Sequence, residues 1–509
     1  MEVGTFDSLI PSRYISFIFP IQSLSCPIDY IVSNYLQISV LDSPFNPTTL
    51  PKIAAMIVPK HRENDWVFTT EAGHLQLLLN SPGISRLILI GNAPNCDINV
   101  GNLYKRSLEN CPNYRVKLEE SLYPLLMALI PKEIAQSGNF DVPFLSYEDN
   151  LISSAVLECC VGDCVGEMLV EDVEIEGSKR EFRRRLRFKK MPNLIQTQIS
   201  IVPNGFDEDI LNSMCFKEGD FEKGIFSLDV RSLVHPYLEP MVSSLCLIGG
   251  YIEECYESNV RPRGLCIGVG GGALLSFLSL QLGFEVVGIE IDEVVLRIAK
   301  QYFGLQTSNS LHLCVGDGIE ILKKVAFLSN NDNAKDVISK DWGRLHEPIY
   351  QSQKIGVKYN DKAFLNNGSK SSSLVDSTTR KDYCKEYIEN FGSKFLVIML
   401  DVDSSDVKME ISAPTLDFFQ KDVLLAAKSS LLNHGILVLN VIPSDKSFYD
   451  MLIHKLKEVF VDLYEIDCGN EENFVLIASK TSVAVTENKF LRKLNSVISG
   501  AFVDSVRKI

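Results

Sequence analysis

The sequence LCIGVGGGALLSFLSLQLGFEVVGIEID, residues Leu265–Asp292, contains the pattern from which we infer the fold. It begins with the apolar residues Leu265–Ile267, enough for a short buried strand. A glycine-rich turn follows. In it, Gly268, Gly270 and Gly272 lack the Cβ atoms that would keep a ligand away from the backbone. We therefore expect a buried strand that ends in a turn able to approach a ligand closely.

The rest of this stretch completes a strand, turn, helix and strand unit. We expect a helix at Leu274–Leu282 and a second strand at Phe284–Ile289, followed directly by Glu290. In such units the turn approaches a nucleotide, and the acid after the second strand accepts hydrogen bonds from ribose hydroxyls. The turn also satisfies a GxGxxA dinucleotide fingerprint. The unit alone therefore leaves open a nicotinamide cofactor, another adenosine ligand, or a tight turn without a ligand.

The alternation of apolar segments continues to the end of the chain. After a helix at Tyr237–Glu254 and the unit above, we predict helices at Val294–Phe303, Ile319–Phe327, Leu416–Leu432 and Ser447–Phe460, and strands at Leu311–Val315, Phe395–Leu400, Ile436–Asn440, Leu463–Ile466 and Phe474–Ser479. Parallel strands that alternate with helices, closed by an antiparallel pair, indicate a doubly wound α/β sheet.

The first half of the chain is expected to be richer in strands. We predict strands at Tyr35–Val40, Leu87–Ile90, Met168–Ile175, Phe182–Phe188 and Leu194–Val202, and a helix at Ala72–Leu79. The chain is divided into a mixed α/β N-terminal region (1–150), a small β-hairpin region (151–235), the α/β sheet domain (236–482) and a C-terminal helical tail (483–509). Residues 328–393 are polar without apolar periodicity, which predicts a disordered insertion within the sheet domain.

Composition excludes several classes of protein. The 509 residues carry a formal charge of −15, which argues against a nucleic-acid partner bound through bulk charge. The 13 cysteines show neither a disulfide framework nor metal-ligand spacing, so we expect reduced thiols, no metal and a cytoplasmic protein. The apolar run 15–21 is too short to span a membrane, and no basic segment precedes it, so we expect neither a membrane partner nor a signal peptide.

One predicted strand is strongly basic. Residues 179–190 carry eight Lys and Arg side chains, including Arg183, Arg184, Arg185 and Arg187. They could bind an acidic partner, but a solvated strand face is the interpretation we favour because the whole chain is acidic. In the N-terminal region, scattered polar residues such as Asp65 and His74 are expected to lie at the surface.

Acids follow three of the predicted parallel strands. Glu290 follows the second strand and Asp317 the third, where its carboxylate could accept from an adenine amine, while Asp401 and Asp403 follow the fourth. Each acid alone could be a helix cap or a solvated strand end. Because open α/β sheets bind ligands at the carboxyl ends of their strands, the four together predict a site there.

These motifs carry a family resemblance. The set GVGGGA, EID, GDG and the strand-end LD resembles class I S-adenosylmethionine-dependent methyltransferases, and VGGG with DSSD resembles their spermidine synthase branch. The stretches Ile57–Gly73, Val170–Phe188 and Val397–Asp406 resemble more closely the C-terminal half of the methyltransferase-like protein 13 family. Its members methylate elongation factor 1-alpha on a lysine, through an N-terminal domain, and on the N-terminal amine, through the C-terminal domain.

The resemblance implies a Rossmann-like class I methyltransferase sheet with S-adenosyl-L-methionine as its cofactor. The implied cofactor-binding residues are Gly268, Gly270, Gly272, Glu290, Ile291, Asp317 and Gly318. Asp401 and Asp403 would be the catalytic acids that orient a cationic amine. The implied partner is a protein substrate such as elongation factor 1-alpha, and a homodimer is left open.

Two departures from the pattern limit what is carried over. No second glycine motif precedes residue 264, so the lysine activity of the family's N-terminal domain is not expected here. Aminopropyltransferases carry Tyr-His-Glu for the polyamine, whereas this chain has Tyr237, Leu238 and Glu239, and Val407 replaces a usual proline. Gln196 does match the polyamine enzymes. An aminopropyltransferase is therefore the alternative function, followed by a non-catalytic relative, with a nicotinamide oxidoreductase more distant.

Overall fold

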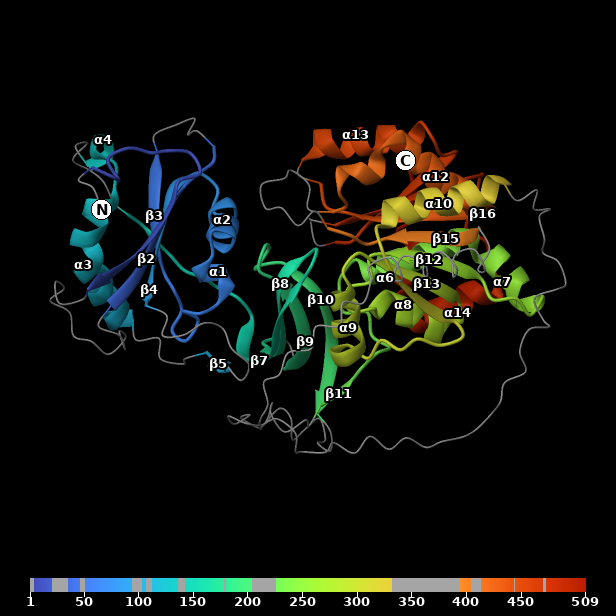
Figure 1. Cartoon of the computed structure of the whole chain (residues 1–509), viewed down its shortest axis with the longest axis horizontal. Coiled ribbons are helices and arrows are strands. Elements are labelled where there is room, and N and C mark those ends of the chain that lie inside the picture. The colour runs from blue at the N-terminus through green and yellow to red at the C-terminus, as the bar shows by residue number, and fades with distance from the viewer. Residues whose placement is uncertain are drawn as a thin grey trace, which may run out of the picture.

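The computed structural model describes residues 4–20, 35–45, 51–93, 103–106, 112–135, 142–177, 180–203, 226–331, 394–403, 413–443, 445–469 and 473–509. Within these residues the chain forms three sheets (Figure 1), and the first two interleave in sequence, because one strand of the second sheet precedes the last strand of the first. The predicted insertion 328–393 lies outside the described residues from residue 332 onward. Its first residues, 328–331, instead continue a helix, because Leu328 still packs against the core.

The first sheet lies between helices on its two faces. Its strands are ordered β1-β2-β4-β3-β6. Their bounds are β1 (Tyr14–Pro20), β2 (Tyr35–Asp42), β3 (Lys52–Ile57), β4 (Ile84–Asn92) and β6 (Phe144–Leu145), and the helices are α1 (Trp66–Thr69), α2 (Glu71–Leu79), α3 (Pro112–Leu129) and α4 (Lys132–Ala135). Leucines of α3 fill the core on one face, and apolar side chains of α1 and α2 fill the other.

The second sheet bridges the first and third sheets. Its strands are ordered β11-β10-β9-β8-β7-β5, with bounds β5 (Leu103–Lys105), β7 (Leu151–Gly162), β8 (Gly166–Ile175), β9 (Glu181–Phe188), β10 (Ile195–Pro203) and β11 (Phe226–Leu228). Trp66 of α1 packs against Val156 and Leu169 of this sheet. On its other side, Leu186 and Ile199 pack against Val295 and Ile298 of α9 (Glu293–Tyr302) in the third unit.

The third sheet has the predicted doubly wound order β14-β13-β12-β15-β16, closed by the antiparallel strands β18, β17 and β19. Its strands are β12 (Arg263–Ile267), β13 (Glu285–Glu290), β14 (Leu311–Val315), β15 (Phe395–Leu400), β16 (Leu431–Val441), β17 (Asp462–Asp467), β18 (Phe474–Ser479) and β19 (Arg507–Lys508). The chain runs from β12 to β14 in one direction and then returns to β15. This reversal places a topological switch point between the carboxyl ends of β12 and β15, where such sheets bind ligands.

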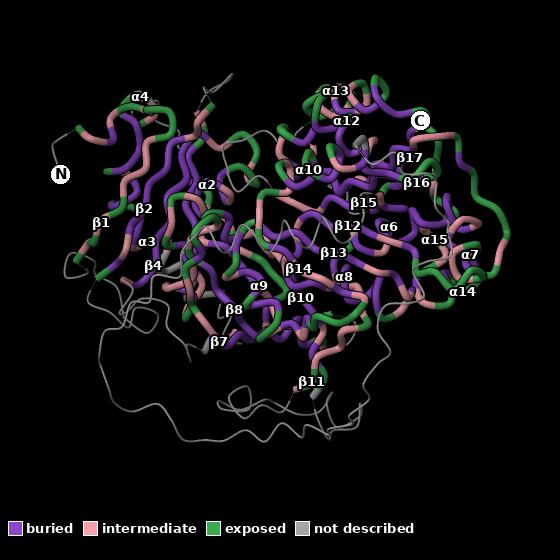
Figure 2. The backbone as a smooth tube through the Cα atoms, turned by 45° about the vertical axis from the view of Figure 1, so that its right-hand side comes forward, coloured by how far each residue is buried: buried purple, intermediate pink, exposed green. Residues whose placement is uncertain are grey.

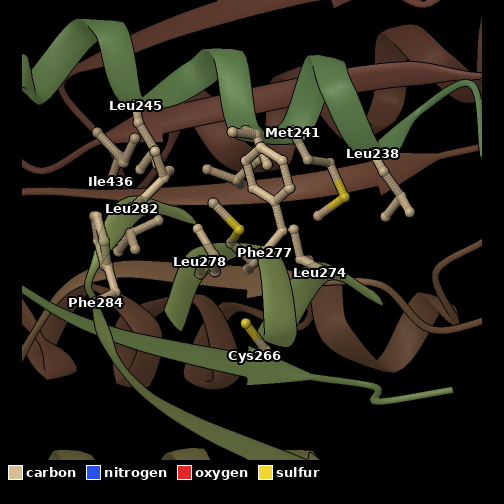
Figure 3. Close-up of a cluster of buried hydrophobic side chains, with 14 of the residues drawn as sticks. Leu238, Met241, Leu245, Cys266, Leu274, Phe277, Leu278, Leu282, Phe284 and Ile436 are labelled. Atoms are coloured by element: carbon tan, nitrogen blue, oxygen red, sulfur yellow. The ribbon is translucent and has the colours of Figure 1, made fainter. Parts of the chain in front are cut away.

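Helices cover both faces of this sheet, whose strands are buried along most of their length (Figures 1 and 2). One face carries α10 (Gly318–Asn331), the 3-10 helix η4 (Leu416–Phe419), α12 (Lys421–Ser430) and α13 (Lys446–Lys457). The other carries α6 (Leu238–Ser243), η2 (Ser244–Ile248), α7 (Gly249–Glu257), α8 (Ala273–Phe277), the π-helical turn η3 (Leu278–Leu282), α14 (Lys489–Val497) and α15 (Gly500–Asp504). Figure 3 shows Leu238, Met241 and Leu245 pointing from their helices toward Phe277 and Leu278.

Three predicted helices are interrupted. The segment 237–254 is α6, a 3-10 turn and α7, because Ser243 and Ser244 hydrogen-bond through their hydroxyls to carbonyls of the preceding turn. The segment 274–282 ends in a π-helical turn, and the segment 416–432 is broken at Gln420, whose backbone is extended. The predicted C-terminal helical tail also ends in β19, which pairs with β17.

No helix among the described residues is long and apolar enough to cross a membrane.

Candidate active site

The glycine turn after β12 lies at the switch point. Gly268, Gly270 and Gly272 have φ of +86°, +49° and +80°, in the left-handed region that favours glycine. A Cβ on Gly268 would come within 1.9 Å of the Asp401 carbonyl oxygen at the end of β15. Only glycine therefore allows the turn and the end of β15 to pack this closely.

The predicted glycines have different roles. A Cβ on Gly272 would meet the Leu305 side chain at 2.6 Å, and one on Gly318 would meet Ile267 Cγ2 at 2.3 Å, so both positions are required for packing. A Cβ on Gly270 would meet nothing closer than Thr197 Cβ at 3.7 Å. Gly270 thus lines space that a side chain would fill, which fits a cradle for a ligand.

Glu290 holds the glycine turn in place. Its Oε2 accepts hydrogen bonds from the backbone N–H groups of Val269 (3.1 Å) and Gly270 (3.3 Å), and its Oε1 accepts from those of Ile291 (3.0 Å) and Asp292 (3.3 Å). Burial raises the pKa of Glu290, and the four hydrogen bonds oppose that shift. The carboxylate is therefore fixed at the edge of the turn.

The remaining predicted cofactor residues line the ends of β13 and β14. Ile291 is 49% exposed, and Val315, at the end of β14, is 41% exposed. Asp317 caps α10, since its Oδ1 accepts from the N–H groups of Ile319 (2.7 Å) and Glu320 (3.1 Å). Apolar surface flanked by two carboxylates suits an adenosine, whose base is flat and whose ribose donates hydrogen bonds.

Asp292 ties the second sheet to this site. Its Oδ1 caps α9 through the N–H of Val294 (2.9 Å), while its Oδ2 accepts from Cys164 N (2.8 Å) and Val165 N (3.1 Å) in the β7–β8 turn. The side chain is 1% exposed. This role was not predicted, because the segments that Asp292 joins are far apart in sequence.

We expect Asp292→Ala to lower the free energy of unfolding by about 2–4 kcal/mol, because it removes a helix cap and two charge-assisted hydrogen bonds. Asp317→Ala is the matched control: it removes only a cap and should cost about 1 kcal/mol. Urea denaturation measures both values, and equal losses would contradict the role of Asp292 in holding the β7–β8 turn against α9.

Asp401 lies on the other side of the turn, at the end of β15. Its Oδ1 accepts from Asn440 Nδ2 (3.1 Å), and its carboxyl also accepts a hydrogen bond from the Tyr237 hydroxyl. Asn440 is itself oriented by Asn473, whose Nδ2 donates to Asn440 Oδ1 (2.9 Å). The pKa of Asp401 is raised to about 6: burial is the main cause, the two hydrogen bonds oppose it, and nearby Asp403 adds to it.

Asp403 faces the second sheet. Burial raises the pKa of its carboxyl, and the neighbouring Gln196 amide lowers it. Neither Asp403 Oδ2 nor Gln196 Nε2 has a hydrogen-bond partner of good geometry among the described residues. Thr197, the next residue of β10, lies against the glycine turn, since a Cβ on Gly271 would meet its Oγ1 at 2.6 Å. The structure thus brings β10 together with both predicted acids and the turn. Residues 404–406, the remainder of the DSSD motif, lie outside the described residues.

The basic strand β9 is not a solvated face. Arg184 makes a two-pronged ion pair with buried Asp172 (2.7 Å and 2.9 Å), and Arg187 pairs with Asp65 (3.0 Å) and Glu171 (2.9 Å). Asp65 is therefore an internal partner across the first and second sheets. His74 is also buried and not at the surface, and burial lowers its pKa to about 3. These ion pairs and the burial of His74 depend on contacts between separate segments of the chain, which is why the local sequence did not predict them.

Comparisons with known proteins agree with the resemblance inferred from the sequence. The chain is similar to the eEF1A lysine and N-terminal methyltransferases of Bos taurus (23% identity over 453 residues) and Homo sapiens (24% over 452 residues). In each case the match covers 86% of this chain and 52% of the relative. The chain thus spans about half the length of the curated relatives it matches. No protein-family model matches it.

Two solved structures are also similar to parts of the chain. Human methyltransferase-like protein 13 in complex with SAH matches 53% of this chain and 92% of its own, with 20% identity and a TM-score of 0.36. A probable spermidine synthase from Corynebacterium glutamicum matches 69% of this chain and 89% of its own, with 11% identity and a TM-score of 0.38. Because both scores are below 0.5, the fold assignment rests on the strand order of this chain, and what the sequence relatives support is a likeness to protein methyltransferases.

Proposed function

We propose that the protein is an S-adenosylmethionine-dependent methyltransferase that acts on the N-terminal amine of a protein, with elongation factor 1-alpha as its substrate. The observation that carries the proposal is the meeting of two sets of residues at one switch point. The glycine turn with Glu290 suits an adenosine ligand, and Asp401, held by Tyr237 and Asn440, lies directly across that turn. The names of the sequence relatives support the choice of substrate.

The residues of the chain mainly position the reactants. When bound, S-adenosylmethionine supplies an activated methyl group. Gly268, Gly270 and Gly272 let the backbone approach the donor, Glu290 holds the ribose, and Ile291, Asp317 and Gly318 line the adenine side. Asp401 and Asp403 orient the cationic amine, and Asp401, ionised at neutral pH, can accept the proton that the amine loses before attack.

Mass spectrometry of the acceptor tests this proposal. Purified protein, S-adenosylmethionine and unmodified elongation factor 1-alpha should yield a methylated N-terminal peptide, and Asp403→Asn should lower turnover more than donor affinity. Gln196 beside Asp403 favours the aminopropyltransferase as second candidate. An unmodified terminus, together with spermidine formed from decarboxylated donor and putrescine, would establish that alternative instead.

The state of Asp401 predicts how acceptor binding depends on pH. Since burial raises its pKa to about 6, the carboxylate loses its charge as the pH falls from 7 to 5, while a terminal amine stays cationic throughout. We expect the affinity of an N-terminal peptide for the SAH-saturated protein to fall over this range. Asp401→Asn should flatten the profile, and an unchanged profile in that variant would contradict the assignment.

The same shift has a consequence for stability. A carboxyl whose pKa is raised on folding stabilises the protein when protonated, fully below its unfolded value of 3.8, and that contribution is lost as the pH rises through about 6. Asp401 at neutral pH is therefore an unfavourable charge for folding, as expected of a residue kept for binding.

We further propose a cytoplasmic location from the cysteine usage, and the division into regions 1–150, 151–235, 236–482 and 483–509. Light scattering of the purified protein would show whether it forms a homodimer.

A further inference from the structure

The face of the second sheet that adjoins Asp401 carries a row of cationic and amide side chains. Alternation along β9 puts Arg183, Arg185 and Arg187 on one face, and Gln198 of β10 lies opposite Arg185. Arg183 Nη1 donates to Gln198 Oε1 (3.2 Å). These side chains lie on the same strand pair as Gln196, which faces Asp403.

His235 connects this row to the predicted acids. Its ring lies 5.3 Å from that of Tyr237, whose hydroxyl donates to Asp401. His235 is 8% exposed, and burial together with Arg183 and Arg185 lowers its pKa to about 4, so the ring is neutral. A continuous path of polar side chains thus runs from the reacting end of the site to the arginines.

The arginines differ in how their charges are compensated. Arg187 pairs with Asp65 and Glu171, and Arg183 donates to Glu181 Oε2. Arg185 lies between these two like charges and opposite Glu171, the carboxylate with which Arg187 already pairs, and its buried Nε has no hydrogen-bond acceptor among the described residues. A buried N–H group of a guanidinium is unfavourable without an acceptor unless something else supplies one.

Other buried polar atoms along the path also lack partners. His235 Nε2 and Arg185 Nε have none among the described residues, and at the reacting end the Gln196 amide lies beside the Asp403 carboxyl without a hydrogen bond of good geometry. The site is therefore bipolar, with carboxylates where the amine would react and donors farther along. A diamine has a cation at each end and would place one toward Arg185, while a peptide has oxygen acceptors behind its amine.

We propose that Gln196, His235 and Arg185 form a subsite that binds the oxygen atoms of the acceptor's chain behind its terminal amine, and that Arg185 selects a polypeptide N-terminus over a diamine. This inference rests on the proposed function and adds the residues that set its specificity. Arg185 is a specificity-determining residue because it is on the path yet remote from the carboxylates that hold the amine.

The test compares Arg185→Met with Arg180→Gln, which removes a charge from the same hairpin. The probe is a synthetic peptide with the N-terminal sequence of elongation factor 1-alpha, titrated into SAH-saturated protein. Arg185→Met should weaken peptide binding about ten- to hundredfold, as expected for the loss of a charge-assisted hydrogen bond. Arg180→Gln should leave it unchanged, donor affinity should stay at the wild-type value in both variants, and the melting temperature should not fall in Arg185→Met.

A second measurement separates specificity from general damage. Putrescine should compete with the peptide poorly in wild type and better in Arg185→Met, because the repelling charge is gone. Equal peptide affinity in wild type and Arg185→Met, or putrescine competition that does not change, would overturn the subsite. A wild-type protein that methylates no N-terminal peptide would instead contradict the proposed function itself, so the two failures are distinguishable.

Discussion

Replacing Gly270 with valine is expected to abolish binding of S-adenosylmethionine while the chain still folds. The nearest described atom to a Cβ at this position is Thr197 Cβ, 3.7 Å away, which is an ordinary contact distance, so the first carbon of the side chain fits without a clash. The φ of +49° adds a backbone cost of about 1–2 kcal/mol, which a domain with two large core clusters can absorb. Calorimetry with the donor should show no measurable heat of binding.

Gly283→Val is the matched control for this experiment. Gly283 has a φ of +77°, and a Cβ added there would meet no described atom within 4 Å, so the substitution causes similar backbone strain away from the site. We expect it to lower the melting temperature to a similar extent but to keep wild-type donor affinity. Wild-type affinity in Gly270→Val, or a loss common to both variants, would show that the turn is not the donor cradle.

Replacing Glu290 with alanine is expected to weaken donor binding by about one to two decades. In the proposed role, Glu290 would accept charge-assisted hydrogen bonds from the ribose, and each such bond is worth about 1.5–3 kcal/mol. The structure adds a second effect, because the N–H groups of Val269 and Gly270 lose their acceptor and the turn is no longer held. Isothermal calorimetry measures the affinity, and urea denaturation measures the accompanying loss of stability.

Glu290→Gln separates these two effects. Glutamine keeps the volume and one acceptor oxygen but carries no charge, so it should retain part of the turn's hydrogen bonding and bind the donor with intermediate affinity. A dissociation constant for Glu290→Ala that equals that of wild type would refute the ribose assignment.

Much of the third sheet could be predicted from the sequence because parallel strands buried on both faces are continuous apolar runs. The strands at Leu311–Val315 and Phe395–Leu400 have the predicted bounds. β16 begins at Leu431, earlier than predicted. The prediction missed its first residues because residues 433–435 interrupt the apolar run. β7 was not predicted, since its Ser, Cys and Glu residues obscure the alternation of a strand.

The parts of the site that joined distant segments could not be predicted. The strand-end rule placed Glu290, Asp317 and Asp401 correctly at one edge of the sheet. Nothing in the local sequence indicates that Asp292 receives the β7–β8 turn or that Asn440 holds Asp401. Such pairings depend on how whole elements pack, and a carboxylate in a strand-end motif looks the same whether it is exposed or buried.

The pairing of β12 with β15 divides the third sheet into two halves, each continuous in sequence, with Gly268 directly after β12 in one half and Asp401 directly after β15 in the other. Closing a chain segment costs entropy that grows only with the logarithm of its length, about 0.6 kcal/mol for each doubling. The length of the connection between α10 and β15 can therefore vary widely among related proteins at little thermodynamic cost. Because the β12–β15 pairing joins two halves that are each continuous in sequence, the sheet is a candidate for fragment complementation. Recovered donor binding would then report that the two halves had assembled.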